Sequence, residues 1–248
     1  QAVGAIWILC FLTGKKTILR LKKESMRLEV RVFGPCLALG ISTFVMLSTE
    51  SLLSISFTNS LSRYDGDVAV GAMTIITSIN QLVAMPVQGI CQGGQPIISY
   101  NYGADKPERV KKAFFTQFCA CVAYTFTFWA VIMFFPQVFA SIFTANKELV
   151  EYSSWALRIY MAGIFSTGFQ ISCQQSFMAL GQAKVSLLLA CLRKIILLIP
   201  LIFILPHFLP DKVFAVFLAE PVSDILAAAA TTITFLTLFN SILKKETK

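Results

Sequence analysis

Residues 185–207 read VSLLLACLRKIILLIPLIFILPH, and this stretch decides the class of fold. It contains no carboxylate, and the bases that precede His207 within it are Arg193 and Lys194. A helix needs about 20 consecutive, mostly apolar residues to cross the hydrocarbon core of a bilayer. The stretch therefore predicts a membrane-spanning helix.

Further apolar segments occur on both sides of this helix, separated by charged residues or by glycine and proline. They cover residues 1–13, 32–59, 68–100, 112–135, 149–180 and 212–240. The whole chain is 56% hydrophobic and 14% charged, whereas a soluble domain carries about a quarter charged residues. These features predict an all-α, polytopic helical membrane protein.

The first segment, residues 1–13, is shorter than a complete span and is expected to be the end of a transmembrane helix. Residues 14–31 are polar and basic, and we expect a cytoplasmic linker between two bundles, with an ordinary long cytoplasmic loop as the alternative. Residues 32–243 are expected to form a six-helix transmembrane bundle. Residues 244–248 then form a basic cytoplasmic tail.

Lys and Arg residues are distributed unequally between the two sides of the membrane. If the connections between successive apolar segments lie on alternating sides, 17 of the 21 Lys and Arg residues fall on the side of residues 14–31 and the C-terminal tail. The other side then carries 4. Because cytoplasmic loops are enriched in Lys and Arg, the C-terminus is predicted to be cytoplasmic in a multi-pass protein of the plasma (inner) membrane. The net charge of +8 thus reflects topology among membrane lipids, and no nucleic-acid partner is expected.

The residue types needed for a metal site or for catalysis are scarce. The seven cysteines form no C-x-x-C pair, and the single histidine, His207, does not complete a metal-binding set. The sequence has no G-x-S-x-G, P-loop or H-E-x-x-H motif. We therefore expect no enzyme activity, no bound metal and no cofactor.

Glu50 is the clearest polar candidate, because it lies deep in segment 32–59. A carboxylate at mid-membrane costs about 2.5–3.5 kcal/mol on insertion scales and suggests a functional site. Thr43, Glu50 and Ser54 share one helical face. Glu50 is expected either to hold a proton or a small cation, or to be a protonated structural residue bonded to a neighbouring helix.

Two other polar groups occur within the spans. Thr167, Gln170 and Gln174 share one face of segment 149–180, where they either join helices or line a polar cavity. Glu220 and Asp224 are spaced by one helical turn in the last segment, so their charges repel unless one is protonated or paired with a base. We expect them to form a structural polar cluster with Arg193 or Lys194 of the preceding segment.

One stretch resembles a known family signature. Residues 89–104, GICQGGQPIISYNYGA, are followed by Arg109 and Lys111. Together they resemble the signature of bacterial members of the MATE family, the multidrug and toxic compound extrusion transporters. Weaker resemblance comes from Glu220-Pro221 with Asp224, and from the sequence MALGQA at 178–183. The glycines and Pro96 of this signature indicate either a structural role at the end of the helix, with Pro96 resisting its continuation, or contact with a ligand. Pro86, which precedes the signature, is expected to kink the helix.

The resemblance implies two six-helix bundles joined by a cytoplasmic linker. On that template, residues 1–13 are the end of the sixth helix and 32–240 are helices seven to twelve, so the N-terminal bundle is a missing partner. The family exports cationic and amphipathic drugs by antiport with Na⁺ or H⁺. By resemblance, Glu50 corresponds to a seventh-helix carboxylate that is implicated in cation coupling.

The resemblance leaves the coupling ion open. Thr167 falls where many sodium-coupled members carry an aspartate in the tenth helix, and this chain lacks the first helix, through which some members couple. Two alternative functions also remain at this point: a lipid-linked oligosaccharide flippase of the same superfamily, and a truncated product without transport activity.

Overall fold

The computed structural model describes residues 2–13 and 30–245, without the side chains of residues 9, 30–47, 183 and 240–245. Most of the predicted linker and the last part of the predicted tail therefore lie outside the described residues. The chain divides into two units, residues 1–48 and 49–248. The first contains helix α1 (Ala2–Thr13) and the beginning of helix α2 (Val30–Gly103). The linker and domain boundaries stay predictions.

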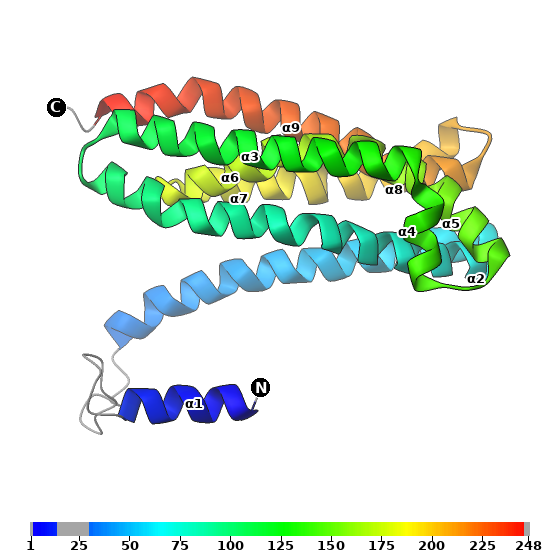
Figure 1. Ribbon diagram of the computed structural model, residues 1–248, viewed down its shortest axis with the longest axis horizontal. Helices are drawn as coiled ribbons and strands as arrows, with labels where there is room; N and C mark the ends of the chain where they lie inside the picture. The colour runs from blue at the N-terminus through cyan, green and yellow to red at the C-terminus, as the bar shows by residue number, and fades with distance from the viewer. Residues whose placement is uncertain (1, 14–29, 246–248) are drawn as a thin grey trace. The chain divides into compact units, whose positions relative to one another are not determined.

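The second unit is built from helices alone in the part of the chain that is described (Figure 1). After α2 come α3 (Pro107–Phe134), α4 (Pro136–Phe143), α5 (Lys147–Tyr160), the 3₁₀-helix η2 (Met161–Ser166), α6 (Thr167–Ala179), α7 (Ala183–Cys191), the π-helix η3 (Leu192–Leu198), α8 (Ile199–Phe208) and α9 (Lys212–Lys245). Helix α9 packs against α5, η2, α6, η3 and α8, so it is central to the bundle.

Helix α2 reverses direction at Gly66. Its 74 residues would extend about 110 Å at 1.5 Å per residue, far more than the roughly 30 Å of a bilayer core. At Gly66 the backbone has φ 69° and ψ −149°, a conformation that favours glycine because it has no Cβ. The two arms on either side correspond to the predicted segments 32–59 and 68–100 (Figure 1).

Pro96 was expected to resist continuation of the helix, but the second arm of α2 extends beyond it, as the predicted segment 68–100 does. The helix continues past it to Gly103, and the backbone is also helical at Pro86. Proline removes one backbone hydrogen bond, but membrane helices tolerate this when neighbouring groups satisfy the freed carbonyl.

The predicted fold class is confirmed. Within the described part of the chain, four helical stretches are long and apolar enough to cross a membrane: Ser48–Gly103, Pro107–Phe134, Lys184–Phe208 and Lys212–Phe239. The predicted segment 149–180 corresponds to α5, η2 and α6 in succession. Large apolar side chains such as Phe115, Leu188 and Leu236 are exposed on the outside of the bundle, as expected for surfaces in contact with lipid.

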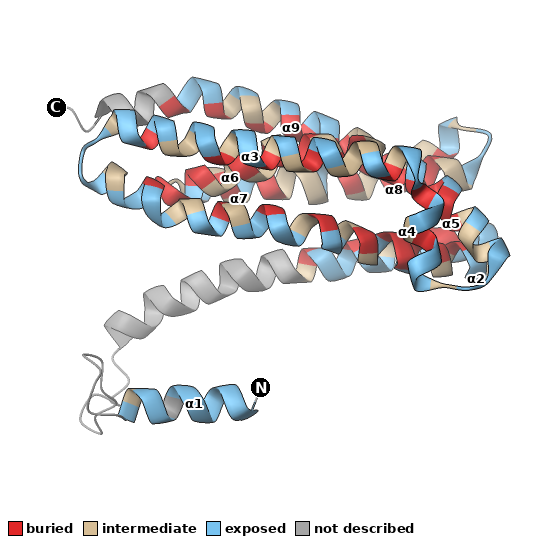
Figure 2. Cartoon of the chain, viewed as in Figure 1, coloured by how far each residue is buried: buried red, intermediate tan, exposed pale blue. Residues whose placement is uncertain are grey.

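The largest apolar core lies where the two arms of α2 meet α5, α8 and α9. It includes Phe57, Leu61, Leu157, Ile202 and Phe217, all of which are buried. In Figure 2, buried positions are dense at the end of the bundle near the labels of α4, α5 and α8. A second, smaller core near the other end contains Phe177 and Phe235. Helices η3 and α9 contribute residues to both cores. These two helices also carry the buried charged residues described below.

Two helical passes depart from α geometry where they contact α9. Helix η2 is a 3₁₀ segment between α5 and α6, and η3 is a π segment between α7 and α8. Both pack against α9. Such irregular turns within helices frequently mark functional sites, and non-helical backbone at membrane depth is tolerated only where protein or a cavity surrounds it.

Gly163 in η2 sits directly against Pro221 of α9. A Cβ at position 163 would lie 2.7 Å from Pro221 Cα, so Gly163→Ala should destabilise the protein by about 1–3 kcal/mol through overpacking. Thermal unfolding of the purified protein in detergent measures this effect. Gly89→Ala is the matched control, since a Cβ at position 89 would meet nothing within 4 Å. Equal unfolding midpoints for the two variants would contradict the close contact.

Candidate functional site

Glu50 lies on the first arm of α2 and forms an ion pair with Lys194 of η3. The Glu50 side chain is 60% exposed and that of Lys194 is 20% exposed. Ser54 on the same face is also exposed, whereas Phe57, one turn further, is buried in the core. The side chain of Thr43 lies outside the described residues. Glu50 is therefore an accessible carboxylate whose charge is balanced by a lysine.

Arg193 and Lys194 are neighbours in η3 but face different helices. Lys194 reaches Glu50 of α2, while Arg193 reaches Glu220 and Asp224 of α9. Successive residues of a helix project in different directions. The π-helix η3 therefore lies between Glu50 on one side and the pair Glu220 and Asp224 on the other. One short segment thus connects an exposed carboxylate with a buried pair of carboxylates.

The structure brings Arg193, Glu220 and Asp224 together in the interior. Arg193 Nη2 lies 3.2 Å from Glu220 Oε1 and 2.6 Å from Asp224 Oδ1. The three side chains are only 17%, 7% and 5% exposed, respectively. Ser223 Oγ also donates a hydrogen bond of 3.0 Å to the backbone carbonyl of Arg193. These contacts tie the π segment to α9.

The polar face of α6 splits into three different environments. The Thr167 hydroxyl donates to the carbonyl of Ile164 in the preceding turn at 2.7 Å. Gln170 is buried, and its Oε1 has no hydrogen-bond partner. Gln174 Nε2 donates to the backbone carbonyl of Ser186 at 3.1 Å and thereby joins α6 to α7. The three residues therefore share a face without forming one site.

Sequence reasoning missed the pairing of Lys194 with Glu50, because the two residues are 144 positions apart. The sequence feature that could have indicated this pairing is the presence of two adjacent bases in an apolar span. Arg193 and Lys194 are costly at membrane depth unless each is compensated, and the spans contain three candidate acids.

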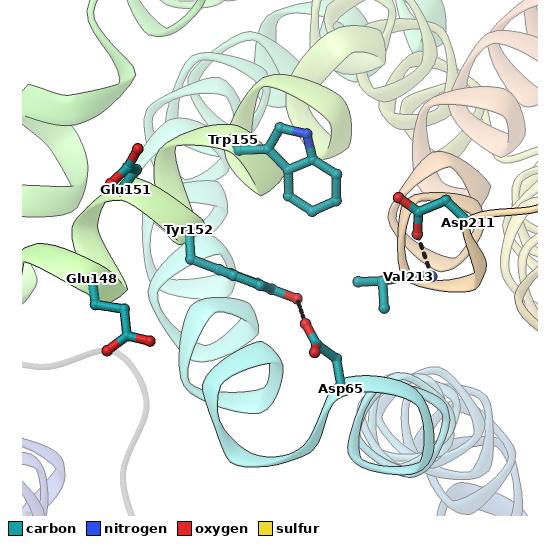
Figure 3. Close-up of a pocket in the computed structure, with 7 residues that line it drawn as sticks. All are labelled: Asp65, Glu148, Glu151, Tyr152, Trp155, Asp211 and Val213. Atoms are coloured by element: carbon teal, nitrogen blue, oxygen red, sulfur yellow. Dashed lines mark hydrogen bonds between the residues drawn. The ribbon is translucent and has the colours of Figure 1, made fainter.

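A cavity of about 660 Å³ lies at the end of the bundle where α2 reverses (Figure 3). It is lined by Asp65, Glu148, Glu151, Tyr152, Trp155, Asp211 and Val213. Tyr152 donates its hydroxyl hydrogen to Asp65. Asp211 Oδ1 accepts from the backbone N–H groups of Val213 and Phe214 at 3.1 and 3.0 Å, and so caps α9. This acidic surface was not predicted from the sequence, and its negative potential attracts cations.

Among the residues that the structure describes, no group of three His, Cys, Asp or Glu side chains could hold a metal ion. The charged groups described inside the bundle include Glu50, Glu220 and Asp224 with the bases that contact them. The Glu50–Lys194 pair is the more accessible of the two charged groups, with Glu50 60% exposed. The buried Arg193 cluster has much less access to solvent.

The sequence profile of the MatE family matches residues 42–204 of this chain. The Multidrug export protein MepA of Staphylococcus aureus is 24% identical over 213 residues, which cover 82% of this chain and 44% of MepA. An FAD transporter of Shewanella oneidensis is 24% identical over 162 residues, covering 65% of this chain and 35% of the transporter. The chain thus spans about half the length, or less, of these relatives.

Solved structures with the same fold include MATE in the bent conformation, with a TM-score of 0.87 at 17% identity. That comparison covers 100% of this chain and 55% of the other. The MATE multidrug transporter DinF-BH in complex with rhodamine 6G has a TM-score of 0.78 at 32% identity. It covers 96% of this chain and 52% of the other.

Proposed function

The chain belongs to the MatE family, and from this premise we propose that it forms part of a secondary active multidrug efflux transporter. Members of this family are transporters and not enzymes. In the proposed function, the protein exports cationic and amphipathic compounds by antiport with Na⁺ or H⁺. A second, N-terminal bundle completes the substrate cavity, in keeping with the half-length match to its relatives.

The observation that carries this proposal is the accessible ion pair between Glu50 and Lys194. Glu50 lies within the residues that match the family, and a carboxylate at membrane depth is a natural site for a coupling cation. Lys194 balances the charge of Glu50 when no external cation is bound. Binding of Na⁺ or H⁺ at Glu50 then releases Lys194. When Lys194 pairs with Glu50 again, it favours dissociation of the bound ion.

The charges favour a cationic substrate over an anionic lipid-linked sugar. A flippase for such lipids needs unpaired basic groups in its cavity. Arg193 and Lys194, the bases in the described mid-span positions, both contact carboxylates. The name of MepA, a multidrug export protein, and the complex of DinF-BH with rhodamine 6G support drug-like compounds as substrates.

Transport of rhodamine 6G into inside-out membrane vesicles tests the proposal. One set of vesicles carries an imposed proton gradient, a second an imposed Na⁺ gradient, and a third neither. We expect dye accumulation with one of the two gradients and none in the third set. Accumulation without any gradient, or none with either gradient, would overturn ion-coupled drug export. Competition by a lipid-linked oligosaccharide, but not by other organic cations, would instead favour the flippase.

We also propose that the loop around Gly66 faces outward and that the C-terminus is cytoplasmic. The supporting observation is the excess of basic residues near residues 103–112 and in the tail. In a background without native cysteines, a membrane-impermeant thiol reagent applied to cells should label Ser62→Cys and not Ala104→Cys. Both positions are exposed, so permeabilised cells provide the control in which both are labelled. The reverse pattern would invert the topology.

A further inference from the structure

The buried cluster on α9 contains more negative than positive charges. Glu220 and Asp224 both contact the single guanidinium of Arg193. The neighbouring base, Lys194, is engaged by Glu50 on α2. If both carboxylates were ionised, the interior would hold one uncompensated negative charge, which is strongly unfavourable in a low-dielectric environment.

The two carboxylates are not equivalent. Asp224 Oδ1 lies 2.6 Å from Arg193 Nη2 as an ion-pair contact without a hydrogen bond, whereas Glu220 Oε1 accepts a hydrogen bond from the same nitrogen at 3.2 Å. The second oxygen of Glu220, Oε2, is buried and has no hydrogen-bond partner. An ionised carboxylate with a bare, buried oxygen is costly, and a proton on that oxygen removes the charge.

The ionisable groups around Glu220 come from several helices. Tyr160 of α5, Arg193 and Lys194 of η3, and Glu50 of α2 lie within electrostatic range. Helix α6 and η2 carry no charged residue, and the one histidine of α8 lies in its last turn. Lys184 of α7 is exposed at the far end of that helix. Arg193 is therefore the base that contacts both acids.

From this geometry we propose that Glu220 is a buried proton-binding site, distinct from Glu50. Arg193 and Asp224 form the fixed ion pair, and Glu220 carries the proton that neutralises the remaining charge. Adjacent bases on one π turn, Arg193 and Lys194, connect this site to Glu50. A change of charge at Glu50 or at Glu220 therefore alters the electrostatic environment of the other. It goes beyond the proposed function, since the proton is bound whether or not the protein exports drugs.

Infrared spectroscopy of the purified protein in lipid at neutral pH tests this site. We expect the carbonyl stretching band of a protonated carboxylic acid. Labelling glutamate side chains with carbon-13 should shift the band to lower frequency, and labelling aspartate should not. Absence of the band, or a shift with labelled aspartate alone, would overturn the proposal. Because this measurement uses the unaltered sequence, it does not depend on the folding of any variant.

Substitutions then assign the proton to one residue. Glu220→Gln should abolish the band, whereas Glu108→Gln, at an exposed surface pair with Lys111, should retain it. Asp224→Asn should also abolish the band, because Arg193 then faces one acid and Glu220 ionises. A band that survives Glu220→Gln would place the proton elsewhere. A band that survives Asp224→Asn would contradict the claim that excess negative charge is the cause of the protonation. Drug efflux enters none of these readouts, so they stand apart from the transport assay.

Discussion

Replacing Glu50 with glutamine is expected to reduce ion-coupled drug efflux to the level of cells that lack the protein, with normal expression. The substitution keeps the size of the side chain but removes the charge that we propose holds a coupling cation, and it leaves Lys194 without its acidic partner. Efflux of rhodamine 6G from preloaded cells measures the effect, with membrane abundance measured in parallel. Unchanged efflux would remove Glu50 from the mechanism.

The loss in Glu50→Gln could arise from the missing carboxylate or from the stranded lysine. The double variant Glu50→Gln with Lys194→Met separates these causes, because it removes both charges of the pair. If Glu50 itself binds the coupling ion, the double variant stays inactive. Recovery of efflux in the double variant would show that an unpaired Lys194 was the only defect. Glu108→Gln, at a distant exposed ion pair, should leave efflux unchanged.

Replacing Arg193 with methionine should have the largest effect on stability. Glu220 and Asp224 would then share a buried site without their base, and breaking a buried ion pair in this way costs about 3–5 kcal/mol. We expect a strongly lowered midpoint of thermal unfolding in detergent and reduced abundance in the membrane. Arg158→Met is the matched control, because Arg158 is exposed on α5.

A rescue experiment identifies the cause of that loss. Combining Arg193→Met with Glu220→Gln and Asp224→Asn removes every ionisable group of the cluster and leaves side chains of similar size. Since the penalty comes from unpaired buried charge, the triple variant should regain most of the stability. If it is no more stable than Arg193→Met alone, the guanidinium contributes through packing, and electrostatics is not the main term.

The helical architecture could be predicted because apolar length is a local property. The segments 32–59 and 68–100 became the two arms of α2, and the charged stretch between them contains the turn at Gly66. The irregular turns could not be predicted, because they depend on contacts between distant helices. Gly163 in η2, for example, lies against Pro221 of α9, and nothing in the local sequence signals this.

The charged residues also could be predicted only in part from the sequence. The spacing of Glu220 and Asp224 by one turn places both on one helical face, and the need to compensate them pointed to Arg193 or Lys194. Which base meets which acid depends on η3, whose π geometry orients two adjacent residues toward α2 and α9. The acidic cavity likewise combines residues from three separate loops and helix ends, which the sequence does not bring together.

Substrate-driven ion movement tests the central claim, coupling through Glu50, most directly. Proteoliposomes are loaded with rhodamine 6G and diluted into dye-free buffer without any ion gradient, and internal pH and Na⁺ are followed by fluorescence. The account predicts that dye leaving the vesicles drives H⁺ or Na⁺ inward, and that this ion movement is absent with Glu50→Gln. Dye efflux with no ion movement, or equal ion movement with Glu50→Gln, would contradict it.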